Sequence, residues 1–130
     1  MARTPEGSVK AAVRKVLDAN GAYYFMPVSN GMGVMGVFDI VCCINGFFLG
    51  VECKSDGKKK PTALQTKQAL KALDSSGFVF LAHADNLTEL EYTIRQIKEI
   101  NYGTKRCSFW PVDGSVPINE RQARALGVPL

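Results

Sequence analysis

The sequence GVFDIVCCINGFFLGVECK, residues 36–54, carries the strongest structural signal in this chain. Its two halves, 37–44 and 47–54, are rich in β-branched and aromatic residues, which predicts two strands. Asn45 and Gly46 lie between them, and this dipeptide is the strongest short-range signal for a two-residue hairpin turn. The sequence therefore predicts an antiparallel β-hairpin at the centre of the fold.

A two-residue turn also fixes which residues of the two strands face each other. Counting outward from the turn, Ile44 pairs with Phe47, and at the far end of the hairpin Asp39 pairs with Glu52. Directly opposed residues have Cβ atoms about 5 Å apart, so two carboxylates there repel each other. Lys54 follows two positions after Glu52 and is expected on the same face. The hairpin thus brings two acids and a lysine together.

Two carboxylates that lie together among apolar neighbours either share a proton or hold a cation. A hard divalent ion such as Mg²⁺ binds carboxylate and carbonyl oxygens, which Asp39, Glu52 and the backbone carbonyl of Cys53 can supply. Water on such an ion is acidified and can attack phosphorus. Lys54 would orient that water or offset charge on the phosphate. A purely structural ion pair among these residues is the alternative interpretation.

The rest of the chain predicts helices and strands around this hairpin. Thr4, Pro5 and Glu6 are typical of a helix start, and Thr62 with Gln65 forms a capping box. We expect helices over 4–20, 61–73 and 88–101, an extended segment over 22–26, a glycine-rich loop over 29–36, an interior strand over 78–82, and a short helix over 119–126 that Gly127 ends. This order fits an α/β fold, a mixed sheet with helices packed against it.

Composition bounds the class of protein. A chain of 130 residues argues for one domain, and a net charge of +4 permits an anionic partner without requiring one. One histidine and four cysteines without metal-ligand spacing leave little material for zinc or Cys-His chemistry. No apolar run is long enough to span a bilayer, so we expect a cytoplasmic protein that does not bind membranes.

Taken together, three parts of the sequence resemble the PD-(D/E)XK nuclease superfamily and, within it, the virus-type replication-repair nuclease (VRR-NUC) branch. The matching residues are Gly36-Val37-Phe38-Asp39, Glu52-Cys53-Lys54 and Gln65. The resemblance covers about residues 4–83 and includes Glu6, near the start of the first helix. One residue departs from the family pattern, because Phe38 stands where the family usually has a proline before the aspartate.

The resemblance implies a restriction-endonuclease-like (PD-(D/E)XK) α/β fold, with a mixed sheet flanked by helices. The nuclease domain would span 1–102, and an extension over 103–130 would pack on that domain or on a dimer partner. The implied function is a Mg²⁺-dependent DNA endonuclease of phage or repair origin, with Mn²⁺ as a substitute ion. Such enzymes act as homodimers on branched DNA, as Holliday-junction resolvases do, in a bacterial or phage-infected cytoplasm.

The same resemblance assigns roles to individual residues. Asp39, Glu52 and Lys54 would be catalytic, with the two acids and the Cys53 carbonyl on the metal ion. Gln65 would support the site, and Glu6 would reach the ion. The helix over 88–101 and the aromatic pair Phe109 and Trp110 are our candidates for the dimer contact.

Several of these residues also have simpler explanations. Gln65 completes a capping box, and Glu6 opposes the dipole of the first helix. The lysine run is either a solvated loop or a phosphate contact, and we group it with the glycine-rich loop as the candidate DNA-binding residues: Lys58, Lys59, Lys60, Ser29, Asn30 and Gly31. His83 is expected to be structural. The rival functions are a nuclease for flaps, nicks or plain duplexes, and a nucleic-acid-binding protein of the same fold that does not cleave.

Overall fold

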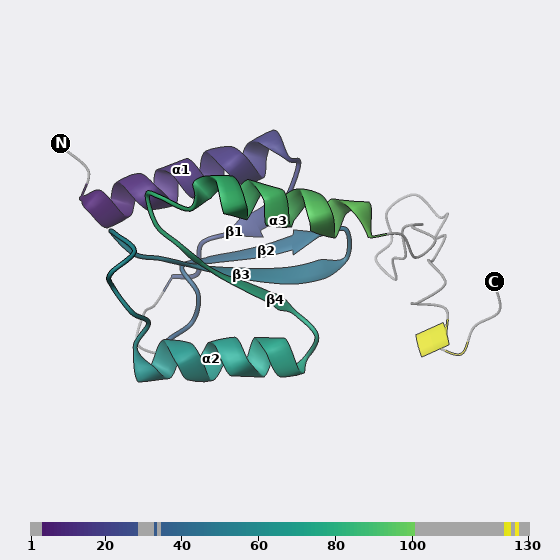
Figure 1. Cartoon of the computed structure of the whole chain (residues 1–130). Coiled ribbons are helices and arrows are strands. Elements are labelled where there is room, and N and C mark those ends of the chain that lie inside the picture. Colours follow the sequence, from purple (N-terminus) through teal and green to yellow (C-terminus); the bar gives the residue numbers. More distant parts are fainter. Residues whose placement is uncertain (1–3, 29–32, 34, 101–123, 126, 128–130) are drawn as a thin grey trace. The chain divides into compact units, whose positions relative to one another are not determined.

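The computed structural model describes residues 4–28, 33, 35–100, 124–125 and 127. Contacts divide the chain into two units, residues 1–98 and 99–130. Over the described residues, three helices and four strands follow one another in the order α1 (Pro5–Ala19), β1 (Tyr23–Phe25), β2 (Ile40–Ile44), β3 (Phe47–Cys53), α2 (Ala63–Asp74), β4 (Phe78–Ala82) and α3 (Leu87–Glu99) (Figure 1).

The four strands form one mixed sheet. Their order is β1-β2-β3-β4, with antiparallel pairing of β1 with β2 and of β2 with β3, and parallel pairing of β3 with β4. Parallel neighbours need a crossover connection, and α2 supplies it between β3 and β4. Figure 1 shows α1 and α3 on one face of the sheet and α2 on the other. The protein therefore has an α/β fold with a four-stranded mixed sheet flanked by three helices.

The hairpin register is confirmed for the five pairs of the ladder, and the sixth predicted pair, Asp39 with Glu52, is not part of it. Ile44 lies opposite Phe47 and Ile40 lies opposite Val51, as the turn rule predicts. Asn45 and Gly46 have φ angles of 53° and 82°, which is the left-handed pair that a type I′ turn requires. The side-chain amide of Asn45 also donates to the carbonyl of Ile97 at 2.9 Å, which ties the turn to the end of α3.

Both predicted helix starts are confirmed by their caps. The hydroxyl of Thr4 accepts from the amide of Gly7 at 3.0 Å at the start of α1. At the start of α2, the Gln65 amide donates to the Thr62 hydroxyl at 3.2 Å, and the Thr62 amide donates back to Gln65 Oε1 at 2.8 Å. These contacts satisfy amides that have no partner inside the helix.

The core lies between the sheet and the pair α1 and α3. On β2, Ile40, Cys42 and Ile44 are buried while Val41 and Cys43 are not, because alternate side chains of a strand point to opposite faces. The buried positions of α3 are the three that the sequence predicts. The apolar cluster consists of Val9, Val13, Leu17, Ile40, Cys42, Ile44, Leu49, Val51, Cys53, Ala82, Leu90, Ile94 and Ile97.

Two expectations about the strands were wrong. β2 begins at Ile40 rather than at residue 37, because Gly36 turns the chain with a φ of 76° and Asp39 leaves the ladder. β4 is the last strand in the sheet order over the described residues rather than an interior one. Its apolar run reflects helices on both faces of the sheet, which does not require a neighbour on both edges.

The apolar side of α3 is also not available for the dimer contact that we expected there. Leu90, Ile94 and Ile97 are buried in the core of their own chain. Phe109 and Trp110, the other candidates for that contact, lie outside the described residues, and so does most of the expected helix over 119–126. Within that helix, Arg124 and Ala125 are helical, and Gly127 follows with a φ of 68°.

None of the helices in the described part of the chain is long and apolar enough to cross a membrane.

Candidate metal centre and active site

The two predicted acids meet at the end of the hairpin. Asp39 directly precedes β2, Glu52 is the last residue but one of β3, and their side chains share a hydrogen bond. Asp39 Oδ2 also accepts from the amide of Cys53 at 2.8 Å. If the pairing of β2 with β3 continued, the Cys53 amide would face Phe38. The Asp39 carboxylate takes the place of that backbone partner, so β2 begins only at Ile40.

Glu52 is held as an acid. Among the described residues, Glu52 is the only charged residue that is buried. Burial, the hydrogen bond to Asp39 and the charge of Asp39 raise the pKa of Glu52 to about 8, against a smaller opposing effect of Lys54. At neutral pH Glu52 therefore carries a proton, which it donates to Asp39.

Asp39 is held as a carboxylate. Burial by itself would raise its pKa, but the hydrogen bonds from Glu52 and the Cys53 amide, together with Lys10, lower the pKa below its ordinary value. Without a metal ion, the pair thus shares one proton and carries one negative charge.

One oxygen of the pair is unsatisfied. Glu52 Oε2 is buried and has no hydrogen-bond partner within the described part of the chain. A buried polar atom without a partner is costly, and such atoms often mark a place for an absent ion or water. The carbonyl of Cys53 points to the same side as its amide, toward Asp39, because both groups of one strand residue face one neighbour. Two carboxyl groups and this carbonyl are hard oxygen donors that suit Mg²⁺ or Mn²⁺.

Lys54 lies beside the pair and is positioned by α2. Its ammonium donates to Gln65 Oε1 at 3.0 Å, and the same oxygen accepts from the Thr62 amide at 2.8 Å. One atom of Gln65 therefore both caps the helix and holds Lys54. The lysine is fixed relative to the first turn of α2.

Glu6 does not contact the two acids directly. Its carboxylate lies 3.6 Å from the ammonium of Lys10, and that ammonium lies 3.5 Å from Asp39 Oδ1. No group of three or more acidic, histidine or cysteine side chains that could hold a metal ion occurs among the described residues. Glu6 is thus joined to Asp39 through Lys10, and its charge helps to raise the pKa of Glu52.

Lys10 itself was not expected at the site. Burial by itself would lower its pKa, but the charges of Asp39 and Glu6 raise the pKa above the ordinary value, so Lys10 is a cation. The only sequence signal was its spacing of four residues from Glu6 on one helix. That spacing does not indicate that α1 packs with this side chain against the start of β2.

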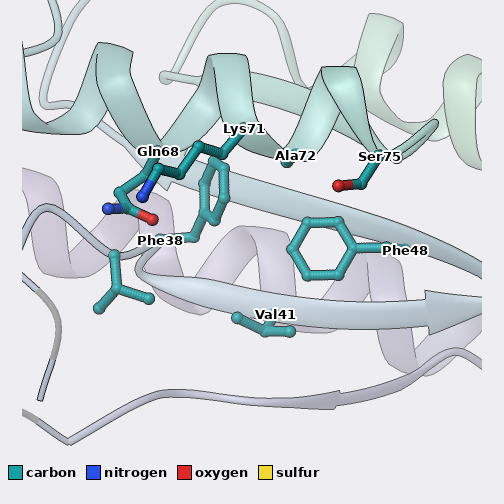
Figure 2. A pocket seen from close by; sticks show the side chains of 9 residues that line it. Phe38, Val41, Phe48, Gln68, Lys71, Ala72 and Ser75 are labelled. Carbon is teal, nitrogen blue, oxygen red and sulfur yellow. The ribbon is translucent and has the colours of Figure 1, made fainter.

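The α2 face of the sheet contains two cavities. Figure 2 shows the rings of Phe38 and Phe48 between α2 and the strands, in a groove of about 410 Å³ whose rim includes Gln68 and Lys71. A second cavity of about 270 Å³ is lined by Phe38, several apolar residues of α2 and β4, and the Glu52 side chain. No residue of α2 is buried. The helix is therefore packed loosely over the strands that carry the acids.

Phe38 lines both of these cavities. A Cβ atom on Gly50 would lie 2.6 Å from the ring of Phe38, so the ring lies directly on the backbone of β3. Gly36 is similarly close to α2, since a Cβ there would lie 2.6 Å from the backbone of Leu64. Two glycines therefore let the segment before Asp39 pack tightly between β3 and α2.

The remaining candidate residues lie apart from the acids or outside the described residues. Lys58, Lys59 and Lys60 are exposed in the loop that follows Lys54. Ser29, Asn30 and Gly31 lie outside the described residues. The ring of His83 accepts from the Asp85 amide at 3.1 Å through Nδ1, which fits a structural histidine.

Comparison with protein-family models, with curated proteins and with solved structures found no match for this chain.

Proposed function

We propose that this protein is a Mg²⁺-dependent DNA endonuclease with a restriction-endonuclease-like fold, similar to the VRR-NUC branch of the PD-(D/E)XK nucleases. The observation that carries the proposal is the buried pair of Asp39 and Glu52, in which one oxygen of Glu52 has no partner. A structural ion pair would be expected to satisfy its own buried atoms. An orphaned carboxyl oxygen beside a second carboxyl group is what a site for a divalent cation would leave when the ion is absent.

The metal ion would be held by Asp39 Oδ1, by Glu52 and by the carbonyl of Cys53. When bound, it would supply an acidified water and stabilise negative charge on the phosphate. Glu52 must lose its proton to act as a ligand, and the cation provides the positive charge that favours that loss. The amide of Cys53 keeps Asp39 oriented through Oδ2.

Lys54 is the residue that we assign to the reacting phosphate. Its ammonium is held at 3.0 Å by Gln65 Oε1, which fixes the direction of a long and otherwise flexible side chain. From there it would orient the attacking water or neutralise the charge that develops on phosphorus. Gln65 acts through Lys54, and so it is a positioning residue.

The DNA would be bound on the side of the sheet where the chain leaves β3. The exposed run Lys58, Lys59 and Lys60 follows Lys54 there and can neutralise backbone phosphates. We propose branched DNA as the substrate and a homodimer as the active form, because two symmetric sites could cut two strands of one junction. The branched substrate and the homodimer are both proposed from the resemblance to the nuclease family.

The proposal is tested by cleavage of labelled four-way junction, flap, nicked and plain duplex DNA in Mg²⁺, Mn²⁺ or EDTA, with the molecular mass measured in solution. We expect cleavage of the junction that needs the divalent ion, and a mass of two chains. Preferred cleavage of flaps or nicks by a monomer would instead support the alternative nuclease. Binding to DNA without cleavage in any metal would overturn the assignment and favour a non-cleaving DNA-binding protein.

A further inference from the structure

Lys10 lies where a metal ion would approach Asp39. One oxygen of that carboxylate, Oδ2, is already bonded to the Cys53 amide at 2.8 Å. The other oxygen, Oδ1, faces the Lys10 ammonium at 3.5 Å. The position that Asp39 could offer to a cation is therefore partly filled by a cation of the protein itself.

The geometry limits how both cations could be accommodated. Mg²⁺ and Mn²⁺ lie about 2.1 Å from their oxygen ligands, so an ion on Oδ1 would stand within about 6 Å of the ammonium as it now lies. At such a distance the two positive charges repel, and the carboxylate cannot compensate both fully. Metal binding is therefore disfavoured as long as Lys10 stays beside Asp39, and it favours movement of Lys10 away from that carboxylate.

Glu6 gives the displaced ammonium a place to go. It lies one helical turn before Lys10, at 3.6 Å, and its side chain is more exposed than that of Asp39. The ammonium can therefore rotate toward Glu6 and solvent while it keeps one ionic partner. The same contact occupies the carboxylate that was expected to serve as a further metal ligand.

We infer that Lys10 is a built-in counter-ion that competes with the divalent cation for Asp39 and thereby weakens the metal affinity of the site. The inference rests on the proposed metal centre. Without metal, Lys10 offsets the charge of Asp39 and links α1 to the segment just before β2. With metal, Lys10 is released to Glu6.

The experiment is a calorimetric titration of the full, metal-free chain with Mn²⁺ and no DNA. Lys10→Met keeps most of the aliphatic stem and removes the charge, so it should bind Mn²⁺ about three- to tenfold more tightly than the unsubstituted protein. Lys15→Met is the matched control, because Lys15 is exposed on the same helix and its loss changes the net charge equally. It should leave the affinity unchanged.

A second readout guards against misfolding. The metal-free Lys10→Met protein should melt at a lower temperature than the unsubstituted protein, and Mn²⁺ should raise its melting temperature by more. Lys10→Gln should behave in the same way. Equal or weaker Mn²⁺ binding by both Lys10 variants, while the unsubstituted protein binds, would overturn the inference and leave the metal centre standing. Absence of Mn²⁺ binding in every variant would overturn the metal centre itself.

Discussion

The face of the sheet under α1 and α3 is filled by one apolar cluster, whereas the face under α2 holds two cavities and the buried carboxyl of Glu52. Leu17 of α1 and Ile94 of α3 are 0% exposed, but Leu70 of α2 is 55% exposed. The two faces are formed by alternate side chains of the same strands.

The face under α1 and α3 is expected to supply most of the stability, and the face under α2 carries residues of the proposed chemistry. Close packing on the first face buries apolar area, which is the main favourable contribution to folding. On the second face, α2 contributes the capping-box residue Gln65, whose side chain accepts from Lys54, instead of a buried leucine. Changes on the first face should therefore affect stability, and changes on the second should affect activity.

A large effect on activity, second only to the loss of either acid, is expected from Lys54. Lys54→Ala should lower the single-turnover cleavage rate by at least about 100-fold, because it removes the positioned ammonium, while DNA and Mn²⁺ binding remain measurable. Lys54→Arg should restore little, since a planar guanidinium does not fit the place of a compact ammonium and does not lose its proton. Lys67→Ala, an exposed lysine of α2, serves as the control. Near-normal rates for Lys54→Arg would mean that the lysine only balances charge.

The largest effect on stability is expected from the packed face. Ile94→Ala should lower the free energy of unfolding by about 3 kcal/mol, because it leaves a cavity in a fully buried site. Leu70→Ala removes a similar side chain from α2 and should cost less than about 1 kcal/mol. Urea unfolding followed by circular dichroism measures both. Equal losses would show that α2 is packed as firmly as α3 in solution.

A smaller effect on stability is expected at Gly50 of β3, a strand whose side chains reach both faces of the sheet. Gly50→Ala puts a methyl group 2.6 Å from the Phe38 ring and should destabilise the protein by about 1–3 kcal/mol. Gly33→Ala is the control, since a Cβ there has no neighbour within 4 Å in the part of the chain that the structure describes. If Gly50→Ala proved as stable as Gly33→Ala, the ring of Phe38 would not lie on β3 as described.

The smallest effect concerns pH. The pKa of Glu52 is raised to about 8 from 4.5, so the stability that its proton contributes is complete below the unfolded pKa and is lost as pH rises through about 8. Without metal, the melting temperature should fall by several degrees from about pH 6 to about pH 9. Glu52→Gln should show a flatter profile, because its amide does not titrate. A profile unchanged by that substitution would contradict the shared proton.

What the sequence predicted correctly depends on short-range rules. The turn at Asn45 and Gly46 requires a particular backbone, and that backbone fixes every pairing from Ile40 to Val51. The helix caps depend on residues three positions apart. Such features do not depend on how the elements later pack.

What the sequence did not predict depends on tertiary contacts. The start of β2 differs from the prediction because the Asp39 carboxylate accepts from the Cys53 amide, a contact between the segment before β2 and the end of β3. The position of Lys10 depends on how α1 docks against the hairpin, and one helix alone contains no such information. The edge position of β4 was missed because an apolar run reflects covered faces and says nothing about edges.

The central claim is that Asp39 and Glu52 hold a divalent ion that serves phosphodiester cleavage. Its most direct test is single-turnover cleavage of junction DNA in Mg²⁺ by Asp39→Asn and Glu52→Gln, with DNA affinity measured in parallel and Asp74→Asn, an exposed acid at the end of α2, as control. We expect each of the two variants to cleave at least about 1,000-fold more slowly than the unsubstituted protein while retaining its DNA affinity. Cleavage by either variant at a near-normal rate would contradict the claim.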